Sequence, residues 1–378
     1  MNDIIGTFAG VTANPYQTLA DWKQRTGKKI IACFPMHVPE ELIHAAGMLP
    51  VVMWESNELI TVAHGHVSPF NCGLVRSIVD DAVRGKLSFL DGTVLYDTCL
   101  QARSMPFLVG QLLQPAYTEI LYLSPVLTSS VTKSFLMENL ERFKTSLEKF
   151  SGQEITSARL RESIEIYNEN RRLLRQLYEL RRKNPGLLRA KEVLAIVRSS
   201  MLMPKEEHSE LLQKLLPQLE NARPVSDRRI KVVLVGNLCQ APATDILDAV
   251  EEAGGVVVDD DLFTGYRYFA NDCDVSDNLI ESLVERFRKR VPPCPTKVDW
   301  ETEWADYVMN VVKRSGARGV VTLLVKYCPP HMTYYPDVKR RLAAAGVPEL
   351  MLETEHEVVS LAQIKTRLRA FIETLGGA

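Results

Sequence analysis

The chain has 378 residues, of which 46% are hydrophobic and 24% charged, as in a soluble globular protein long enough for two domains. Its 45 Lys and Arg residues against 47 Asp and Glu residues leave a formal charge of −2, which excludes a general attraction to nucleic acid or to an anionic membrane. Charges interrupt every apolar run before the ~20 residues of a membrane span, and no leader sequence is recognisable, so we expect a cytoplasmic protein.

Strands and helices alternate near the start of the sequence. Apolar runs predict strands, and a stretch opened by proline and closed by glycine predicts a helix. In chain order the predicted elements are a strand at 28–34, a helix at 39–47, a strand at 49–53, a helix at 74–83 and a strand at 92–96. This alternation is typical of βαβ units and therefore of a parallel sheet.

From about residue 132 to residue 222, apolar residues recur at three- and four-residue intervals. This pattern predicts a helical segment with breaks at 184–186 and near Pro204. Part of the segment is basic and contains Arg171, Arg172, Arg175, Arg181, Arg182 and Lys183. These cations could meet a phosphate-bearing ligand such as coenzyme A, but we favour the interpretation as a solvated helix face.

A second alternation of strands and helices follows. Its predicted elements are strands at 230–236, 256–258 and 319–325 and helices at 244–253, 304–314 and 361–375. Three adjacent aspartates, 259–261, cannot easily converge on one ion, so we interpret them as a solvated turn and not as a metal site. The expected fold class is α/β, with two Rossmann- or flavodoxin-like parallel-sheet domains at 1–131 and 229–378 and a helical connecting region at 132–228.

Cys328 is the most informative residue of the second unit. It follows the apolar run at 319–325, so its thiol is expected at the carboxyl edge of a parallel sheet, where ligands of open α/β folds bind. Pro329 and Pro330 stop the strand and suit a fixed loop. A thiol presented in this way is a candidate metal ligand or nucleophile.

Four other cysteines are similarly placed. Strand-like runs end in or lead to Cys33, Cys99 and Cys239, while Cys72 opens a predicted helix whose dipole would favour a thiolate. Taken singly, each is more often a buried structural residue. The seven cysteines are scattered and include no Cys-x-x-Cys pair, which argues against a disulfide framework, structural zinc and a ferredoxin-type cluster. The spacing permits a site assembled from both domains, such as an iron–sulfur cluster with one iron position open.

Several short motifs lie in order along nearly the whole chain. They include Pro-Phe-Asn-Cys-Gly-Leu-Val-Arg-Ser at 69–77, Asp-Thr-Cys at 97–99 and Lys-Tyr-Cys-Pro-Pro at 326–330. The others lie at 33–35, 39–50, 335–336, 353–355, 363, 366–367 and 370–371. Together these motifs resemble the 2-hydroxyacyl-CoA dehydratase and benzoyl-CoA reductase family, and in particular its smaller cluster-bearing subunits.

The resemblance implies that Cys72, Cys99 and Cys328 each give one thiolate to a [4Fe-4S] cluster, whose fourth iron takes a ligand from outside these motifs. Cys33 and Cys239 would then be neighbours of the cluster, and Cys239 could approach it. Similar proteins pair with a homologous cluster-bearing subunit and receive single electrons from a separate iron–sulfur protein that hydrolyses ATP. The electron goes to an acyl-CoA thioester and creates a ketyl-type radical anion, which needs a dry, oxygen-free pocket.

Residues near these motifs are further candidates. His331 and Tyr334, after Cys328, are candidate proton donors or thioester-orienting groups, although they could equally pack or cap the loop. His37, in the turn after the first strand, is a candidate of the same kind. We interpret the other reactive side chains as structural. Those expected to hold the terminal helix against the cluster loop after Cys328 are Glu355, Gln363 and Arg367, and those expected to serve a loop are His64 and His66.

Two reactions occur in the family, reduction of the aromatic ring of benzoyl-CoA and elimination of water from a 2-hydroxyacyl-CoA. Dehydratase subunits often have an acidic residue after the last cluster cysteine, where this chain has Pro-Pro-His-Met at 329–332. That departure favours an aromatic acyl-CoA reductase, with a dehydratase subunit as the alternative. Two further alternatives are an electron-relay or scaffold subunit without its own substrate site and an α/β protein without a metal.

Overall fold

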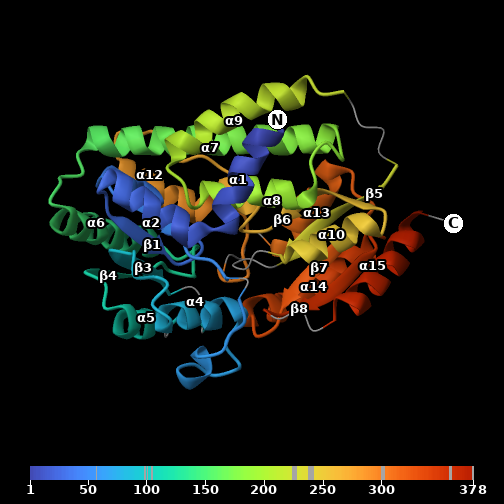
Figure 1. Cartoon of the computed structure of the whole chain (residues 1–378), viewed down its shortest axis with the longest axis horizontal. Helices are drawn as coiled ribbons and strands as arrows, with labels where there is room; N and C mark the ends of the chain where they lie inside the picture. The colour runs from blue at the N-terminus through green and yellow to red at the C-terminus, as the bar shows by residue number, and fades with distance from the viewer. Residues whose placement is uncertain are drawn as a thin grey trace.

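The frame of the protein is a pair of four-stranded sheets in which all neighbouring strands are parallel (Figure 1). The computed structural model describes residues 1–56, 58–97, 99, 101–103, 105–223, 228–236, 242–298, 303–356 and 360–376. The predicted α/β class with two parallel sheets is confirmed. Within the described residues, no helix combines the length and the apolar character that a membrane span needs.

The first sheet has the order β2-β1-β3-β4. Its strands are β1 (Ile30–Cys33), β2 (Leu49–Val52), β3 (Gly92–Tyr96) and β4 (Tyr117–Leu121). The helices and helical turn that accompany it are α1 (Asn2–Ala13), α2 (Pro15–Thr26), α3 (Glu40–Ala45), η1 (Ala63–Gly65), α4 (Gly73–Val83) and α5 (Met105–Leu113). Along β1, Ile30 and Ala32 face one apolar core while Ile31 and Cys33 face another, because successive side chains of a strand point to opposite faces.

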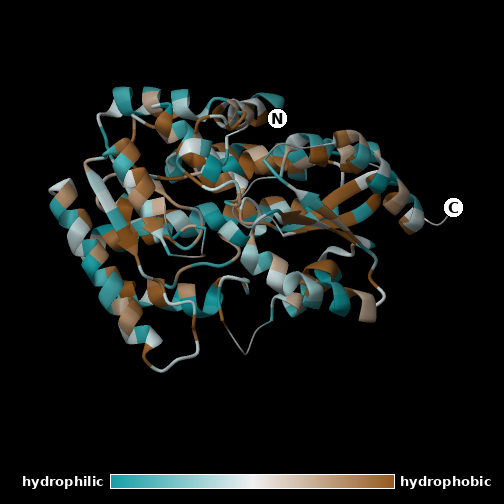
Figure 2. Cartoon of the chain, turned by 90° about the horizontal axis from the view of Figure 1, so that it is seen from below, coloured by the Kyte–Doolittle hydropathy of each residue, from teal (hydrophilic) through white to brown (hydrophobic). Residues whose placement is uncertain are grey.

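The second sheet repeats this order as β6-β5-β7-β8. Its strands are β5 (Ile230–Gly236), β6 (Gly255–Asp261), β7 (Gly319–Val325) and β8 (Glu349–Thr354). Its helices and helical turn are α10 (Thr244–Glu252), α11 (Tyr266–Phe269), α12 (Leu279–Glu285), η2 (Arg286–Arg290), α13 (Trp304–Ser315), α14 (Pro329–Ala344) and α15 (Leu361–Gly376). Figure 2 shows apolar residues concentrated on the strands and on the inward sides of the helices, as expected for sheets covered on both faces.

Between residues 132 and 220 the described chain forms helices, as the spacing of its apolar residues predicts. They are α6 (Thr132–Ser151), α7 (Ser157–Lys183), α8 (Ala190–Ser200) and α9 (Lys205–Glu220). The longest, α7, runs above both sheets in Figure 1. The prediction of a solvated basic face is wrong for Arg171, Arg175, Arg181 and Arg182, which are buried or half-buried, and holds only for Arg172 and Lys183, which are exposed. Arg171 pairs with Glu41 beside the first sheet, and Arg181 pairs with Asp260 of the second, so the two buried guanidinium groups join the halves of the molecule.

The three aspartates 259–261 do not form a solvated turn either. They are the last residues of β6, and each is at most 3% exposed. Arginines from surrounding helices neutralise them. The pairs are Asp259 with Arg182 and Arg314, Asp260 with Arg181, and Asp261 with Arg267. A buried carboxylate is tolerated when a hydrogen-bonded cation compensates its charge.

Candidate functional site

Cys72, Cys99 and Cys328 meet at the carboxyl ends of the strands. Cys72 immediately precedes α4, Cys99 follows β3 in a short turn, and Cys328 lies between β7 and α14. Burial raises the pKa of Cys72 to about 12. A hydrogen bond from the Val75 backbone opposes this rise, and the charges of Cys99 and Cys328 add to it. Like charges act in this way between near neighbours. The structure therefore brings together the three thiols that the motifs single out, two from the first half and one from the second.

A helix, and not the predicted loop, follows Cys328. Pro329 and Pro330 occupy the first positions of α14, where the missing amide hydrogen costs no helical hydrogen bond. The backbone of Tyr327 has φ 60°, an uncommon value for a residue with a side chain, and it turns the chain from β7 into the helix. Cys328 and Cys72 thus both lie at helix N-termini, whose partial positive charge favours a thiolate.

His331 lies against the sulfur of Cys328. Its Nδ1 atom is 3.1 Å from Cys328 Sγ, and its ring packs edge-on against Trp304 at 5.1 Å between centroids. Burial, and then the charge of Arg267, lowers the pKa of His331 to about 3, so the ring is neutral at physiological pH and can donate one N–H to the sulfur. This contact assigns His331 a positioning role, while proton donation by His331 or by the half-exposed Tyr334 stays a prediction.

A network of charges joins the two cysteine-bearing segments. Arg76, on the first turn of α4, donates to the Glu355 carboxylate at 2.7 Å, and Lys326, two residues before Cys328, lies 3.3 Å from the same carboxylate. Glu355 follows β8 and therefore bridges Cys72 and Cys328 through their neighbours. Glu355 was predicted to hold the terminal helix against the cluster loop; the partners that the structure gives it are Arg76 and Lys326 instead.

Cys294 is a fourth thiol at this edge that the sequence pattern did not reveal. Burial raises the pKa of Cys328 to about 12. A hydrogen bond from the His331 backbone opposes this rise, and the charges of Cys99 and Cys294 add to it. Burial also raises the pKa of Cys99, although a hydrogen bond from the Ala102 backbone N–H lowers it. The charges of Asp97 and Cys294 raise this pKa further by smaller amounts. Cys294 lies in a proline-rich loop with no strand pattern, so only tertiary structure places it here.

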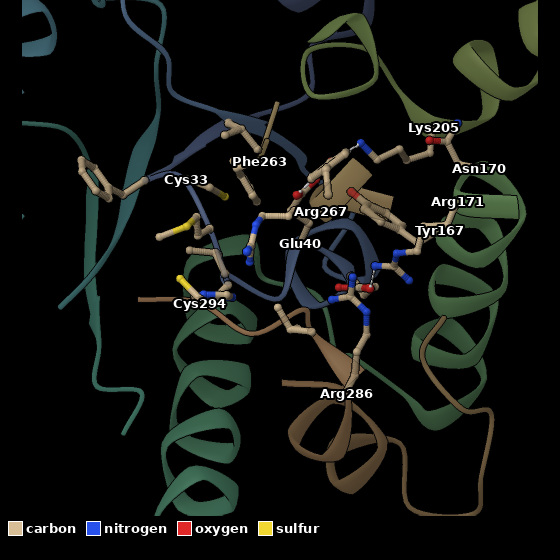
Figure 3. A pocket seen from close by; sticks show the side chains of 18 residues that line it. Cys33, Glu40, Tyr167, Asn170, Arg171, Lys205, Phe263, Arg267, Arg286 and Cys294 are labelled. Carbon is tan, nitrogen blue, oxygen red and sulfur yellow. Dashed lines mark hydrogen bonds and ion pairs between the residues drawn. The ribbon is translucent and has the colours of Figure 1, made fainter. Parts of the chain in front are cut away.

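A small cavity of about 50 Å³ is lined by Cys33 and Cys294 (Figure 3). Cys33 and Cys294 lie on one side of it, and Tyr167, Arg171 and Lys205 lie on the other. This volume holds a few water molecules and is well below the roughly 300 Å³ of a small-molecule site. The cavity is therefore too small for an acyl group.

Opposite charges fill the far wall of the cavity. Tyr268 donates to Glu40 at 2.9 Å and accepts from Lys205 at 2.7 Å. Burial would raise the pKa of Glu41, but the charges of Arg171 and then of Arg286 outweigh it and hold this pKa below its usual range. The wall is thus a fixed network of ion pairs.

His37 borders the same cavity from the end of β1. Both Met36 and His37 have positive φ, 72° and 63°, which marks a strained turn at a sheet edge. Burial, followed by the charges of Lys297 and other cations, lowers the pKa of His37 well below its usual range. Its Nε2 atom is buried and has no hydrogen-bond partner among the described residues. A catalytic role for His37 stays a prediction.

The remaining candidates lie elsewhere. His64 and His66 are exposed residues in and after η1, as expected for a loop role. Arg367 donates to the Met351 carbonyl at 2.6 Å and so holds α15 against β8, whereas the predicted contact was with the cluster loop. Cys239 lies outside the described residues.

An open groove of about 750 Å³ gives access to Cys99. Its walls are largely apolar and include Tyr122, Leu123, Val126 and Phe135. Tyr122 and Phe135 are 50% and 41% exposed, which is unusual for large apolar side chains. The groove has the size and the apolar character that an aromatic group or a partner surface would need.

The donors at this edge suit an iron–sulfur cluster. Thiolates are the protein ligands that such clusters take, and binding removes the thiol proton that burial otherwise retains. Among the described residues, no three His, Cys, Asp or Glu side chains are close enough together to hold a single metal ion. Thiols that surround a body of several atoms need not be that close. The residues present therefore fit the [4Fe-4S] cluster that the resemblance implies.

Comparison with known proteins gives matches over nearly the full length. A family model described as 2-hydroxyglutaryl-CoA dehydratase, D-component, matches residues 35–375. The chain is 28% identical to the (R)-phenyllactyl-CoA dehydratase beta subunit of Clostridium sporogenes, over 97% of each chain. It is 30% identical to the (R)-2-hydroxyglutaryl-CoA dehydratase beta subunit of Acidaminococcus fermentans, over 98% of this chain and 99% of the relative. It is also 25% identical to a benzoyl-CoA reductase subunit of Thauera aromatica, over 94% of this chain and 93% of the relative.

Proposed function

Because this chain belongs to the 2-hydroxyglutaryl-CoA dehydratase, D-component family, we propose that it is the iron–sulfur subunit of an ATP-dependent aromatic acyl-CoA reductase. The observation that carries the proposal is the convergence of Cys72, Cys99 and Cys328 from two sheets. In this proposal the three thiolates hold a [4Fe-4S] cluster, which supplies single electrons at low potential when bound. The partners are a homologous subunit, an ATP-hydrolysing iron–sulfur activator and the acyl-CoA substrate.

The protein's own residues have separate tasks in this function. His331 holds Cys328 through its N–H, and the Arg76–Glu355 pair keeps the two cysteine-bearing segments at a fixed separation. The apolar groove beside Cys99 would accommodate the benzoyl group or a partner surface, whose binding there would displace water from the path to the thiols. The Pro-Pro-His sequence after Cys328 supports the choice of the reductase.

Dehydration of a 2-hydroxyacyl-CoA is the second candidate. It is favoured by the identities to two dehydratase beta subunits, 28% and 30%, against 25% for the reductase relative. The test is to purify the complex without oxygen, measure iron and sulfide, and supply reductant and ATP with either benzoyl-CoA or a 2-hydroxyacyl-CoA. We expect iron, sulfide and consumption of benzoyl-CoA. Turnover of the hydroxyacyl compound alone would select the dehydratase, and absence of iron would overturn both candidates.

A further inference from the structure

Cys294 has the surroundings of a thiolate ligand. Its side chain is 6% exposed and lies in the sequence Pro-Pro-Cys-Pro at 292–295, which restricts the backbone on both sides. The sulfur lies 3.5 Å from the backbone N of Thr296 and 3.0 Å from its Oγ1. Both groups can donate hydrogen bonds to a sulfur that has lost its proton.

The loop of Cys294 is fixed to the wall of the Cys99 groove. Val298 donates its N–H to the Pro125 carbonyl at 2.6 Å, and Leu127 donates to the Val298 carbonyl at 3.2 Å. Pro125 lines the groove that contains Cys99. Residues on the carboxyl side of Cys294 thus hold it beside the thiols of the first half.

Contacts with α13 and α14 connect Cys294 to Cys328. Cys294 and Trp304 line one cavity of about 500 Å³. The Trp304 ring packs on His331, whose Nδ1 is in contact with the Cys328 sulfur. In Figure 3 the Cys294 sulfur points away from Arg171 and Tyr167 on the opposite wall of the smaller cavity. Cys294 is therefore flanked by the segments that carry Cys99 and Cys328, and its thiol does not face the ion pairs.

We propose that Cys294 supplies the fourth thiolate to the cluster held by Cys72, Cys99 and Cys328. This inference rests on the proposed function. On binding, the thiol gives its proton to solvent and its sulfur forms one bond to iron. With four protein thiolates, no iron position remains open to a substrate oxygen. This chain would then pass electrons onward, and bond making and breaking would take place on the partner subunit.

The first test compares anaerobic complexes that contain the wild-type chain, Cys294→Ala or Cys273→Ala. Cys273 is a matched control because it is also buried, at 2% exposed, but its nearest charges are Glu41 and Arg286. Each complex is oxidised mildly with ferricyanide and examined by electron paramagnetic resonance. The partner's cluster keeps an open iron in all three complexes and gives the same [3Fe-4S] background in each, so we expect additional [3Fe-4S] signal, from a cluster in this chain that has lost one labile iron, only in Cys294→Ala. The same signal at equal yield in the wild type would overturn the proposal.

A second test needs no variant and therefore does not depend on folding of Cys294→Ala. The wild-type complex is reduced and mixed with carbon-13-labelled cyanide, which binds an iron that lacks a protein ligand. Pulsed paramagnetic resonance then looks for coupling to the carbon nucleus. We expect cyanide coupled to one cluster per complex, that of the partner, and cyanide coupled to a second cluster would contradict the fourth thiolate. Wild-type protein without iron would instead overturn the proposed function itself, so the two failures are distinguishable.

Discussion

The two sheets of this protein share one strand order but differ in what their carboxyl edges carry. In each sheet a cysteine follows the third strand in spatial order, Cys99 after β3 and Cys328 after β7. The outer strand β2 is apolar throughout, whereas its counterpart β6 ends in three buried aspartates paired with arginines. Repeated topology thus brings the thiols together, while the charged strand fixes the helices around one half.

The largest expected effect comes from removing the cysteine that follows the third strand of either sheet. Cys99→Ala and Cys328→Ala should each abolish the cluster, because each removes one thiolate ligand. Losing a direct ligand should lower metal affinity by more than the ~10–100-fold expected when a residue that only supports a ligand is replaced. Iron content and turnover of the acyl-CoA measure this, with Cys273→Ala as control. If either variant retained iron like that control, the two positions would not be equivalent ligands.

The next effect concerns the charged strand. Arg181→Met leaves Asp260 buried without its cation, and we expect about 3–5 kcal/mol less stability. Thermal unfolding of the anaerobic protein measures the change. The matched control is Arg340→Met, which removes an exposed partner of Asp337 and should cost well under 1 kcal/mol. Equal losses in both variants would mean that the β6 pairs do not stabilise this half.

A smaller effect tests the connection between the halves. Arg76→Met, Glu355→Gln and the double variant form a cycle whose coupling energy should be about 1–2 kcal/mol. The readout is thermal stability together with the rate at which a chelator removes iron. Additive single effects would show that this pair does not hold the segments of Cys72 and Cys328 together.

The smallest expected effect depends on pH. Burial opposes the charged form of His356, but its bond to the Glu55 carboxylate outweighs this and raises the pKa above its usual value. A raised folded-state pKa gives stability that is fully present below the unfolded pKa of about 6.5 and is lost as pH rises through the folded value. Wild type should therefore lose slightly more thermal stability than His356→Gln between pH ~6 and pH ~9. Parallel curves for the two proteins would contradict this linkage.

Much of the frame was predictable from local pattern. The apolar run at 319–325 coincides with β7, and the predicted breaks at 184–186 and near Pro204 separate α7 from α8 and α8 from α9. The break between α6 and α7, at residues 152–156, was not predicted. Cys72 was correctly placed before a helix. These features follow from periodicity and from proline and glycine positions, which act within a few residues.

The errors arose where distant residues decide the outcome. Asp260 looked solvated because its cation, Arg181, is 79 residues away in the sequence. Cys294 was overlooked because no strand leads to it. The helix after Cys328 is a different case, since Pro329 and Pro330 at its first positions were a readable signal for a helix start.

The distribution of thiols along the chain has a consequence for biosynthesis. Cys72 and Cys99 leave the ribosome long before Cys328, which emerges only after the whole first sheet, the helical segment and strand β7. A cluster that needs all three cannot be inserted during translation of the first sheet. In the proposed function, cluster loading would therefore follow docking of both halves, and chains truncated before Cys328 would carry Cys72 and Cys99 as unprotected thiols.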